Sequence, residues 1–465
     1  MFVQNYLKEF NNLTNKIEEK YSLDMLCVCD DKIWPLVKIS LFELISRHKE
    51  RTLTERVKEK YLDYSIKEDI NENLDQKKFD TNAYNDILFL TEDHFYIQIH
   101  DYYVNKYLDP IIEELAKNFV TQKIHLNSKI SKYKKIESYK VASEPHTGNI
   151  KLSSEALDII NNVVSDFNNS YFEKVDLTHL EKMIINKSLD VQEGKSFINN
   201  LGDKPKMIFY SSYSLPFKLG LNIQSKKFNI KTIDVQHGKQ GPNNPLYSNW
   251  GNVTEITHYM LPDYFWTWNM LSKDRIENVG VKKTGLQAVV SGYKFAQTYT
   301  KKENKTKNIL ITLQPLSFKN TFYIQSFLMN YIKKDKNFNW IVKPHPRQTM
   351  RDLVKIKKLF NYPHVTITSN DNIFELLKNS ALHITEYSSS AYEGLYLNVE
   401  TIFTNPIAKD EYFEELKEGK FYYCDNLHKL QKTIDKLMNI EINKVNVLTQ
   451  NDYKYTDLIP VKNLK

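Results

Sequence analysis

Short apolar segments alternate with segments of helical period along the second half of the chain, and this alternation restricts the fold more than any other feature of the sequence. Segments that read as buried strands lie at residues 308–313, 340–343, 365–368, 382–385 and 401–404. Helices are predicted between them at about 322–333, 350–360, 373–378 and 392–397. Repeated βα units of this length specify a doubly wound parallel sheet. A (β/α)₈ barrel would need eight evenly spaced units, which the irregular first half does not offer.

A second set of βα signals lies in the first half of the chain. Residues 87–90 read as a buried strand, and a strand–helix–strand unit is predicted at 207–210, 217–224 and 230–235. A unit of this length suits a βαβ crossover in a parallel sheet. We therefore predict an α/β protein with two Rossmann-like lobes whose parallel sheets face each other across a cleft.

The length of 465 residues suits two domains with appendages. We predict a helical N-terminal segment at 1–85, a first lobe at 86–300, on the acceptor side, and a second lobe at 301–442 that binds the donor. The lysine-rich stretch at 301–307 would join the two lobes. The polar segment at 443–465 could pack back on the first lobe.

Charge and composition exclude several classes of protein. The net charge is 64 − 57 = +7, and it is spread along the chain rather than focused on one basic face with a reading module, so nucleic-acid binding is not expected. The same charge is compatible with weak binding to anionic headgroups at the inner face of the cytoplasmic membrane. No apolar stretch is long enough to span a membrane, and the three cysteines form no disulfide framework, so we expect a cytoplasmic protein.

Polar residues follow two of the predicted strands in the second lobe. Residues 343–347 read Lys-Pro-His-Pro-Arg, and the two prolines hold His345 between Lys343 and Arg347 in a rigid backbone suited to binding phosphate. Residues 385–390 read Thr-Glu-Tyr-Ser-Ser-Ser and open a helix that carries Glu393. Hydroxyls and free amides at a helix start can bind an anion. The alternatives are a rigid turn at His345 and simple helix capping by the serines. The candidate donor-binding residues are Lys343, His345, Pro346, Arg347, Ser388, Ser389, Ser390 and Glu393.

The strand at 230–235 in the first lobe ends in a second candidate group. Asp234 could act as a nucleophile or base and His237 as an acid or phosphate ligand, while Gly238 allows the chain to turn. A polar turn with a hydrogen-bonded histidine is the structural alternative. Glu155 is a weaker candidate for a second carboxylate, which a double displacement at a sugar would use.

Several catalytic motifs are absent from the sequence. It has no GxxxxGK[ST] loop, GxGxxG fingerprint, HExxH helix, GxSxG elbow or kinase motif set. It also has no obvious DxD pair of a metal-dependent transferase. We therefore expect a mechanism without a metal or cofactor, in which cations and helix ends balance the charge of a nucleotide.

The second half of the chain resembles the C-terminal lobe of bacterial GT-B glycosyltransferases that use cytidine-nucleotide donors, a group that includes capsule sialyltransferases and Kdo transferases. His345-Pro346 matches their His-Pro motif, and Ser388-Ser389 with Glu393 matches their Ser-Ser motif; both line the donor site. The Val-Gln-His-Gly sequence at 235–238 is common in surface-polysaccharide transferases of this shape. The arrangement looks most like the retaining β-Kdo transferases, which use a first-lobe aspartate as a covalent nucleophile; this resemblance implies that role for Asp234, with Glu155 as partner.

The resemblance implies a GT-B enzyme of capsule or lipopolysaccharide O-antigen synthesis. It would transfer an acidic sugar, Kdo in the first place, from a CMP-sugar to an oligosaccharide or lipid-linked glycan, with retention through an Asp234-linked intermediate. The catalytic residues would be Asp234, His237 and Glu155. An inverting sialyltransferase, a CDP-glycerol or CDP-ribitol phosphotransferase, and a non-catalytic polysaccharide-binding module of an assembly remain as alternatives.

Overall fold

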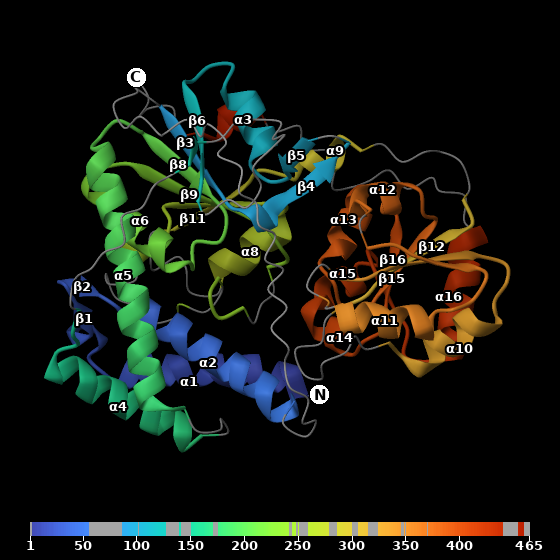
Figure 1. The fold of residues 1–465 in the computed structure, drawn as a ribbon, viewed down its shortest axis with the longest axis horizontal. Coiled ribbons are helices and arrows are strands. Elements are labelled where there is room, and N and C mark those ends of the chain that lie inside the picture. Colours follow the sequence, from blue (N-terminus) through green and yellow to red (C-terminus); the bar gives the residue numbers. More distant parts are fainter. Residues whose placement is uncertain are drawn as a thin grey trace. The chain divides into compact units, whose positions relative to one another are not determined.

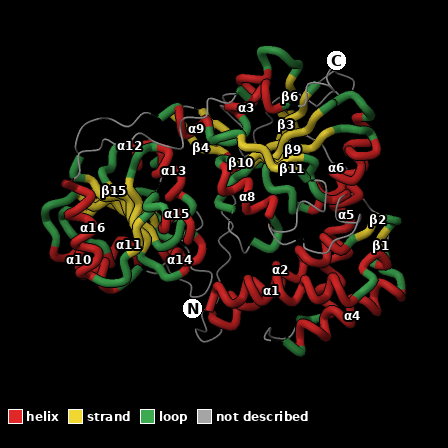
Figure 2. The backbone as a smooth tube through the Cα atoms, turned by 180° about the vertical axis from the view of Figure 1, so that it is seen from behind, coloured by secondary structure: helices red, strands yellow, loops and turns green. Residues whose placement is uncertain are grey.

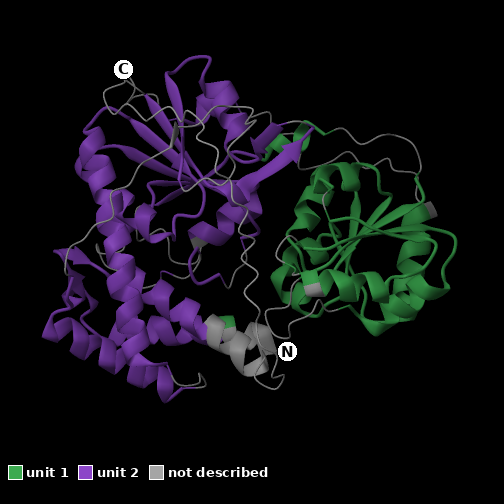
Figure 3. Cartoon of the chain, in the orientation of Figure 1, with its two compact units in different colours: residues 1–8, 293–452 green, residues 9–292, 453–465 purple. Residues whose placement is uncertain are grey.

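The computed structural model divides the chain into two compact units (Figure 3). The first lobe comprises Glu9–Gly292 and Tyr453–Lys465, and the second lobe comprises Met1–Lys8 and Tyr293–Asp452. The division falls ahead of the lysine-rich stretch predicted to join the lobes, because the Phe295 ring already packs on Phe374 of the second lobe at 5.0 Å between centroids. The structure describes residues 2–54, 86–100, 102–126, 139–140, 150–170, 175–240, 244–247, 250, 259–278, 286–299, 306–314, 324–345, 348, 350–369, 371–439 and 454–459.

A seven-stranded sheet forms the centre of the first lobe, and every pairing between its neighbouring strands is parallel. The predicted crossover is confirmed, since the strands at 207–210 and 231–235 pair in parallel with Tyr210 opposite Asp234. Short runs rich in buried Ile, Val and Phe build the strands, as expected for a sheet covered on both faces. In spatial order the strands are β11 (Gln287–Val290), β10 (Tyr264–Thr267), β9 (Lys231–Val235), β8 (Met207–Tyr210), β3 (Ile87–Thr91), β6 (Thr121–His125) and β7 (Tyr139–Lys140).

Helices surround this sheet, and two of them pack unusually closely (Figures 1 and 2). An added Cβ at Gly194 would lie 1.9 Å from the carbonyl oxygen of Phe217, and one at Gly220 would lie 1.8 Å from that of Val191. Only glycine therefore permits the contact between α5 and α6. These two helices are α5 (Leu177–Leu201) and α6 (Pro216–Lys227). The other elements of the lobe between its two terminal parts are α3 (Asp109–Leu115), α4 (Ser154–Asn168), α8 (Met270–Asn278), η2 (Asp93–Phe95) and the antiparallel pair β4 (Tyr96–Ile99) and β5 (Tyr102–Asn105).

Both ends of the chain contribute elements to the first lobe. The predicted helical character of the N-terminal segment is confirmed in its described part, where Trp34 and Pro35 open a helix. Near the other end, the ring of Tyr455 stacks on Trp266 at 5.5 Å between centroids. These elements are α1 (Phe2–Lys20, of which the part from Glu9 belongs to this lobe), η1 (Leu23–Met25), β1 (Cys27–Val28), β2 (Asp31–Lys32), α2 (Trp34–Thr54) and α17 (Tyr455–Leu458).

The second lobe contains a six-stranded sheet in which all neighbouring strands are parallel. Helices α10, α11 and α16 share one buried apolar cluster on one face, and α12 and α13 contact each other on the other face (Figure 1). The strands, in spatial order, are β14 (Val365–Ile367), β13 (Asn339–Lys343), β12 (Asn308–Thr312), β15 (Leu382–Thr385), β16 (Glu400–Phe403) and β17 (Tyr422–Tyr423). The helices are α9 (Lys294–Gln297), α10 (Ser326–Lys334), α11 (Met350–Leu359), α12 (Ile373–Lys378), α13 (Ser390–Tyr396), α14 (Ile407–Glu411), α15 (Phe413–Lys417) and α16 (Leu427–Asn439).

The predicted α/β architecture of two Rossmann-like lobes is confirmed by these two sheets. In each sheet the chain reverses its direction of strand addition once, between β3 and β8 in the first lobe and between β12 and β15 in the second. Open α/β sheets bind their ligands beyond the carboxyl ends of the strands at such a reversal. Among the described residues, no helix combines the length and apolar character that crossing a bilayer requires.

Candidate functional site

The carboxyl ends of the central strands in the first lobe carry a group of buried polar side chains. Glu92 directly follows β3, Ser211 directly follows β8, and Asp234 lies at the end of β9. Since β3 and β8 flank the reversal of the sheet, these residues occupy the position where an α/β fold presents a ligand site.

Asp234 is the centre of this group. Its side chain is fully buried, and its Oδ2 accepts hydrogen bonds from the Tyr213 backbone N–H at 3.0 Å and the Tyr247 hydroxyl at 3.2 Å. Its Oδ1 has no hydrogen-bond partner among the described residues. Burial raises the pKa of Asp234 to about 7, against the opposing effects of those hydrogen bonds and of the Lys218 charge. One carboxylate oxygen is thus held in place and the other is available.

His237 lies three residues further along the chain and is half-buried. The Phe95 ring meets its imidazole edge-on at 5.3 Å between centroids, and the Tyr107 hydroxyl donates a hydrogen bond to its carbonyl oxygen at 2.8 Å. Its Nδ1 has no partner in the described part of the chain. Desolvation, together with the nearby Lys218 charge, lowers the pKa of His237 to about 3. The imidazole is therefore neutral at pH 7 and can accept or donate one hydrogen bond through each nitrogen.

A buried ion pair that sequence patterns did not single out lies beside Asp234. Lys218 of α6 is 1% exposed; its Nζ lies 2.7 Å from Glu92 Oε1 and also donates to the Ser211 carbonyl oxygen. Glu92 shows the same sequence signal as Asp234, an acid at the end of an apolar strand, and Lys218 interrupts an apolar helical segment. The pair places a positive charge near the carboxylate of Asp234 and lowers the cost of ionising it.

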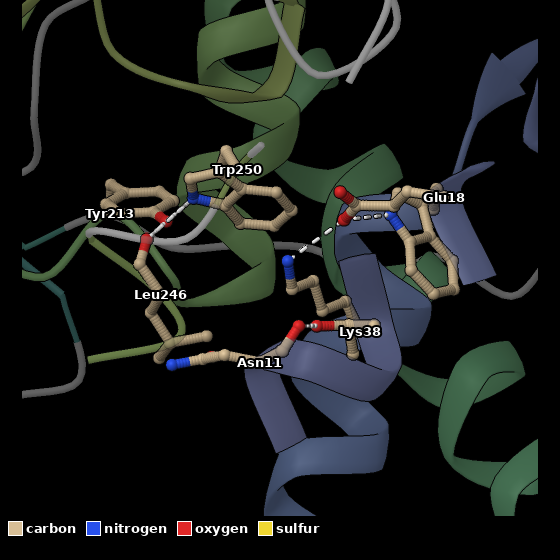
Figure 4. A network of polar contacts seen from close by, with 8 residues as sticks. Asn11, Glu18, Lys38, Tyr213, Leu246 and Trp250 are labelled. Carbon is tan, nitrogen blue, oxygen red and sulfur yellow. Dashed lines mark hydrogen bonds and ion pairs between the residues drawn. The ribbon is translucent and has the colours of Figure 1, made fainter. Parts of the chain in front are cut away.

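Tyr247, which donates to Asp234, directly follows Leu246 in the chain. Trp250 contacts Leu246 and Tyr213 (Figure 4). The Trp250 indole N–H donates to the Leu246 carbonyl oxygen at 2.8 Å and to the Tyr213 hydroxyl oxygen at 3.1 Å. The Tyr213 hydroxyl in turn donates to the same Leu246 carbonyl oxygen. Both residues that donate to Asp234 are therefore connected through one indole.

A lysine from the N-terminal helices lies over the ring of this indole (Figure 4). The Lys38 ammonium lies 4.5 Å from the centre of the Trp250 ring and 2.9 Å from Glu18 Oε1. Glu18 also accepts the Trp34 indole N–H at 3.0 Å. Lys38 and Glu18 are fully buried, with side-chain exposures of 0% and 1%. The N-terminal helices thus contribute a buried charged network that ends at the Asp234 site.

Glu155 is not brought to this group. It lies in the first turn of α4, where its side chain is exposed, and α4 contacts α5 and η1. Figures 1 and 2 both show α4 beside the N-terminal helices, away from the sheet. The Ser153 hydroxyl caps this helix, and the sequence could not show on which side of the lobe the helix packs.

In the second lobe, β13 carries the first candidate motif to the carboxyl edge of the sheet. Lys343 ends the strand, and its Nζ donates to the carbonyl oxygens of Ser369 at 3.2 Å and Asp371 at 2.7 Å. Burial lowers the pKa of Lys343. The His345 backbone N–H donates to Gln348 Oε1 at 2.6 Å and so fixes the turn. Pro346 and Arg347 lie outside the described residues.

The second motif follows β15 at the same edge. Ser388, Ser389 and Ser390 are half-buried, and the Ser390 backbone N–H donates to Ser388 Oγ at 3.2 Å. The Tyr412 hydroxyl donates to the Ser388 carbonyl oxygen at 2.9 Å and holds the turn from below. Glu393, on the first turn of α13, is 5% exposed. The serines follow β15, which pairs with β12 at the reversal of the second sheet. The strand β13, which precedes His345, lies on the other side of β12.

Glu386 is a further buried acid at this edge that was not among the candidates. It is 3% exposed, its Oε1 accepts from the Thr404 hydroxyl at 3.2 Å, and its Oε2 has no partner among the described residues. Burial raises its pKa to about 7. Its sequence signal, an acid directly after a buried strand, is the one that identified Asp234 in the first lobe.

Among the described residues, no group of three or more His, Cys, Asp or Glu side chains is arranged to hold a metal ion. The absence of a metal from the mechanism stays a prediction from the sequence. The described side chains at the carboxyl ends of the two sheets include carboxylates, imidazoles, hydroxyls and the buried ammonium of Lys218.

Comparisons with known proteins found similar structures but no similar sequences. No family model matches the chain, and no curated protein matches it. A UDP-GlcNAc 2-epimerase from Methanocaldococcus jannaschii is 16% identical, with a TM-score of 0.46, over 77% of this chain and 94% of that one. A UDP-N-acetylglucosamine 2-epimerase from Rickettsia bellii is 12% identical, with a TM-score of 0.45, over 78% and 91%. A glycotransferase of kitacinnamycin is 10% identical, with a TM-score of 0.44, over 76% and 90%. These identities are too low to transfer a substrate or mechanism.

Proposed function

We propose that this chain is a GT-B glycosyltransferase of surface-polysaccharide synthesis. Its donor is a CMP-activated acidic sugar, with CMP-Kdo favoured, and its acceptor is a growing oligosaccharide or lipid-linked glycan. The observation that carries the proposal is the state of Asp234, a fully buried carboxylate with one oxygen fixed by two donors and the other unpartnered.

Asp234 is suited to attack the anomeric carbon of the donor sugar. Oδ1 forms the new bond to carbon while the bond from carbon to the phosphate oxygen breaks, and CMP leaves with that electron pair. An acceptor hydroxyl then attacks the same carbon, its proton passes to solvent, and the bond to the carboxylate breaks, so Asp234 is released as the anion and the product retains the configuration of the donor. Donation by Tyr213 and Tyr247 to Oδ2 keeps Oδ1 pointing in one direction, and the Lys218 charge favours the ionised nucleophile.

The second lobe supports the nucleotide part of the proposal. His345 and the serines at 388–390 stand at the carboxyl edge of its sheet, where a departing CMP phosphate would gain negative charge. Lys343 keeps the adjacent loop in place through its two carbonyl contacts, and we assign it a supporting role there. The resemblance of the His-Pro and Ser-Ser motifs to those of cytidine-nucleotide transferases favours CMP over other nucleotides.

One observation favours an inverting transferase as the second candidate. A carboxyl whose pKa is about 7 is well matched to a general base at neutral pH. In that mechanism Asp234 takes the proton of the acceptor hydroxyl and no covalent adduct forms. The inverting sialyltransferase alternative is of this kind, whereas a CDP-glycerol phosphotransferase needs no nucleophile at Asp234.

Mass spectrometry of the intact enzyme incubated with CMP-Kdo, without acceptor, separates these mechanisms. We expect a Kdo adduct on the wild-type chain, located at Asp234 by peptide mapping, and none on Asp234→Asn. Glu155→Gln is the matched control and should form the adduct like the wild type. Product formation without any adduct under slow turnover would instead support the inverting mechanism.

A thermal-shift panel tests the nucleotide separately. CMP should raise the melting temperature of the wild type more than UMP, UDP or GDP. Stabilisation by UDP or GDP but not by CMP would overturn the cytidine assignment. If no nucleotide stabilised the protein and no sugar were transferred, the non-catalytic alternative would be the better reading.

A further inference from the structure

A row of hydrogen-bonded side chains crosses the second sheet from its interior to the serine motif. Thr401 on β16 meets His383 on β15 at 3.1 Å through Nδ1, and His383 meets Thr312 on β12 at 2.9 Å through Nε2. Thr312 Oγ1 lies 3.3 Å from Ser390 Oγ at the start of α13. Thr401 and His383 are fully buried, and Thr312 is 7% exposed. Ser390, at the edge, is half-buried.

Only one direction of donation satisfies this row. The Thr401 hydroxyl is buried, and His383 is its hydrogen-bond partner among the described residues, so its proton can be given only to Nδ1. Burial lowers the pKa of His383 to about 3, so the ring is neutral and carries a single N–H. Because Nδ1 accepts, the proton is on Nε2, which donates to Thr312 Oγ1. Thr312 then has its own proton left to donate to Ser390 Oγ.

The direction of donation along the row determines which hydrogen bond the half-buried Ser390 hydroxyl can still make. Its oxygen already accepts from Thr312, and the structure shows no acceptor for its proton among the described residues. We propose that the Thr401–His383–Thr312 row orients the Ser390 hydroxyl as a hydrogen-bond donor to an acceptor-only group, a phosphate oxygen of the bound nucleotide. His383 and Thr401 are positioning residues in this scheme, since they act through Ser390 and do not touch the ligand.

The opposite direction would leave the Thr401 proton buried without an acceptor and would turn Ser390 into a donor toward Thr312. The serine would then offer only lone pairs to a ligand and would repel a phosphate oxygen. This proposal deepens the proposed function and rests on it for the identity of the ligand. The direction of donation rests on the contacts within the second lobe alone.

Nitrogen NMR of the protein with ¹⁵N-labelled histidine tests the direction without any ligand. We expect His383, assigned by its loss in His383→Gln, to show the Nε2–H tautomer and to stay neutral across the pH range in which the protein is folded. Thr401→Val removes the donor to Nδ1 and should produce a mixture of tautomers, and Thr401→Ser should restore the single form. A wild-type Nδ1–H tautomer would overturn the direction of donation.

Calorimetric titration with CMP tests the consequence for the ligand. Ser390→Ala should weaken CMP binding about tenfold, because a hydrogen bond to a charged group is lost. Thr401→Val should weaken it about threefold although residue 401 is remote from the ligand, and the double variant should bind no more weakly than Ser390→Ala. Thr366→Val, on the exposed side of β14, is the matched control and should bind like the wild type.

The outcomes distinguish this inference from the function on which it rests. CMP binding that is unchanged in Thr401→Val, with Ser390→Ala impaired, would overturn the positioning role. CMP binding with the Nδ1–H tautomer would overturn the row's direction and leave the proposed function intact. Failure of the wild type to bind CMP would overturn the proposed function and the ligand assigned to Ser390, even with the Nε2–H tautomer present.

Discussion

At the scale of single residues, burying the carboxylate of Asp234 destabilises the folded protein but supplies a group that can react at neutral pH. A carboxylate without access to water loses its hydration, and the two hydrogen bonds on Oδ2 replace only part of it. The result is a pKa of about 7, well above the value near 3.9 of an exposed aspartate. Residues that destabilise the fold while fixing a reactive atom are typical of functional sites.

We predict that Asp234→Asn stabilises the protein at high pH and not at low pH. Because the folded-state pKa is raised, the folded form binds more protons than the unfolded form between about pH 4 and pH 7, so this group's contribution to stability falls as the pH rises through that window. The asparagine has no charge to bury, so the variant should gain on the order of 4 kcal/mol over the wild type at pH 8.

Denaturant unfolding at pH 4 and pH 8 measures the difference. The advantage of Asp234→Asn should nearly vanish at pH 4, where the folded wild-type carboxyl is protonated and the unfolded one, with a pKa near 3.9, is about half protonated, so burial of a charge no longer separates the two proteins. Asp158→Asn, at an exposed position of α4, is the control and should show no such pH dependence. Equal stability of wild type and Asp234→Asn at both pH values would contradict the raised pKa.

The same carboxyl should set the pH dependence of transfer. Whether Asp234 attacks the sugar or takes a proton, it must be ionised, so kcat/KM should rise with pH and level off with an apparent pKa near 7. Initial rates with CMP-Kdo and acceptor between about pH 5.5 and 8.5 give this profile. A profile that is flat over this range would show that Asp234 does not titrate in the rate-limiting step.

At the scale of elements, the N-terminal helices are part of the site's support and not a separate cap. Lys38 of α2 and Glu18 of α1 lie behind Trp250, which holds the stretch that carries Tyr247 (Figure 4). Removing one partner of a buried ion pair leaves the other charge without compensation. Loss of either charge, at Lys38 or at Glu18, should therefore affect both stability and the geometry of Asp234.

We predict that Trp250→Phe lowers turnover about tenfold and leaves CMP affinity unchanged. The phenyl ring keeps the contact with Lys38 but loses the N–H that ties Leu246 and Tyr213 together, so the two donors to Asp234 are less well placed. Steady-state kinetics and CMP titration measure the two quantities. Trp34→Phe is the matched control: it loses an indole N–H to Glu18, and we expect reduced stability with near-normal turnover. Equal loss of turnover in both variants would show a general effect on folding.

At the scale of the whole molecule, each lobe has a sheet, a buried core and a reversal point of its own. The proposed function assigns the nucleotide to the second lobe and the covalent step to the first. A binding measurement that resolves the chain into segments can therefore test the division of roles.

Hydrogen exchange of the full-length protein with and without CMP provides that measurement. CMP should protect backbone amides of residues 382–396, which include the serine motif and α13, and should leave residues 207–238 of the first lobe unchanged. CMP-Kdo bound to Asp234→Asn should add protection around residues 207–238. Protection by CMP in the first lobe alone would reverse the assignment of donor and acceptor sides.

The sequence predicted the second lobe well and the first lobe in part. The strand at 382–385 and the helix at 373–378 have the predicted bounds, because apolar runs flanked by turn residues are local signals. The hairpin β4–β5 was not predicted. The strand β6 was not predicted either, since Lys123 and His125 make this buried strand look polar. Their charges are buried because partners arrive from elsewhere, as Asp109 does for Lys123.

The residues of the candidate site were likewise predicted from the sequence only in part. His345, Ser388 and Asp234 could be proposed from the sequence because strand ends, prolines and turn residues place them at a sheet edge. Lys218 and Glu92 could not be recognised as a pair, because nothing local indicates that α6 brings a lysine to the end of β3. For the same reason the exposed Glu155 was chosen as a candidate and the buried Glu386 was not.

The sequence by itself determined the apolar strands of both lobes and the polar residues that end them, because hydrophobic period and turn chemistry act over a few residues. The tertiary structure alone decided which of those polar residues lose water, which find a partner and which keep a free atom. Burial and hydrogen bonding depend on neighbours that are distant in the chain, as Tyr247 and Lys218 are for Asp234, and these neighbours set the pKa and orientation on which the chemistry depends.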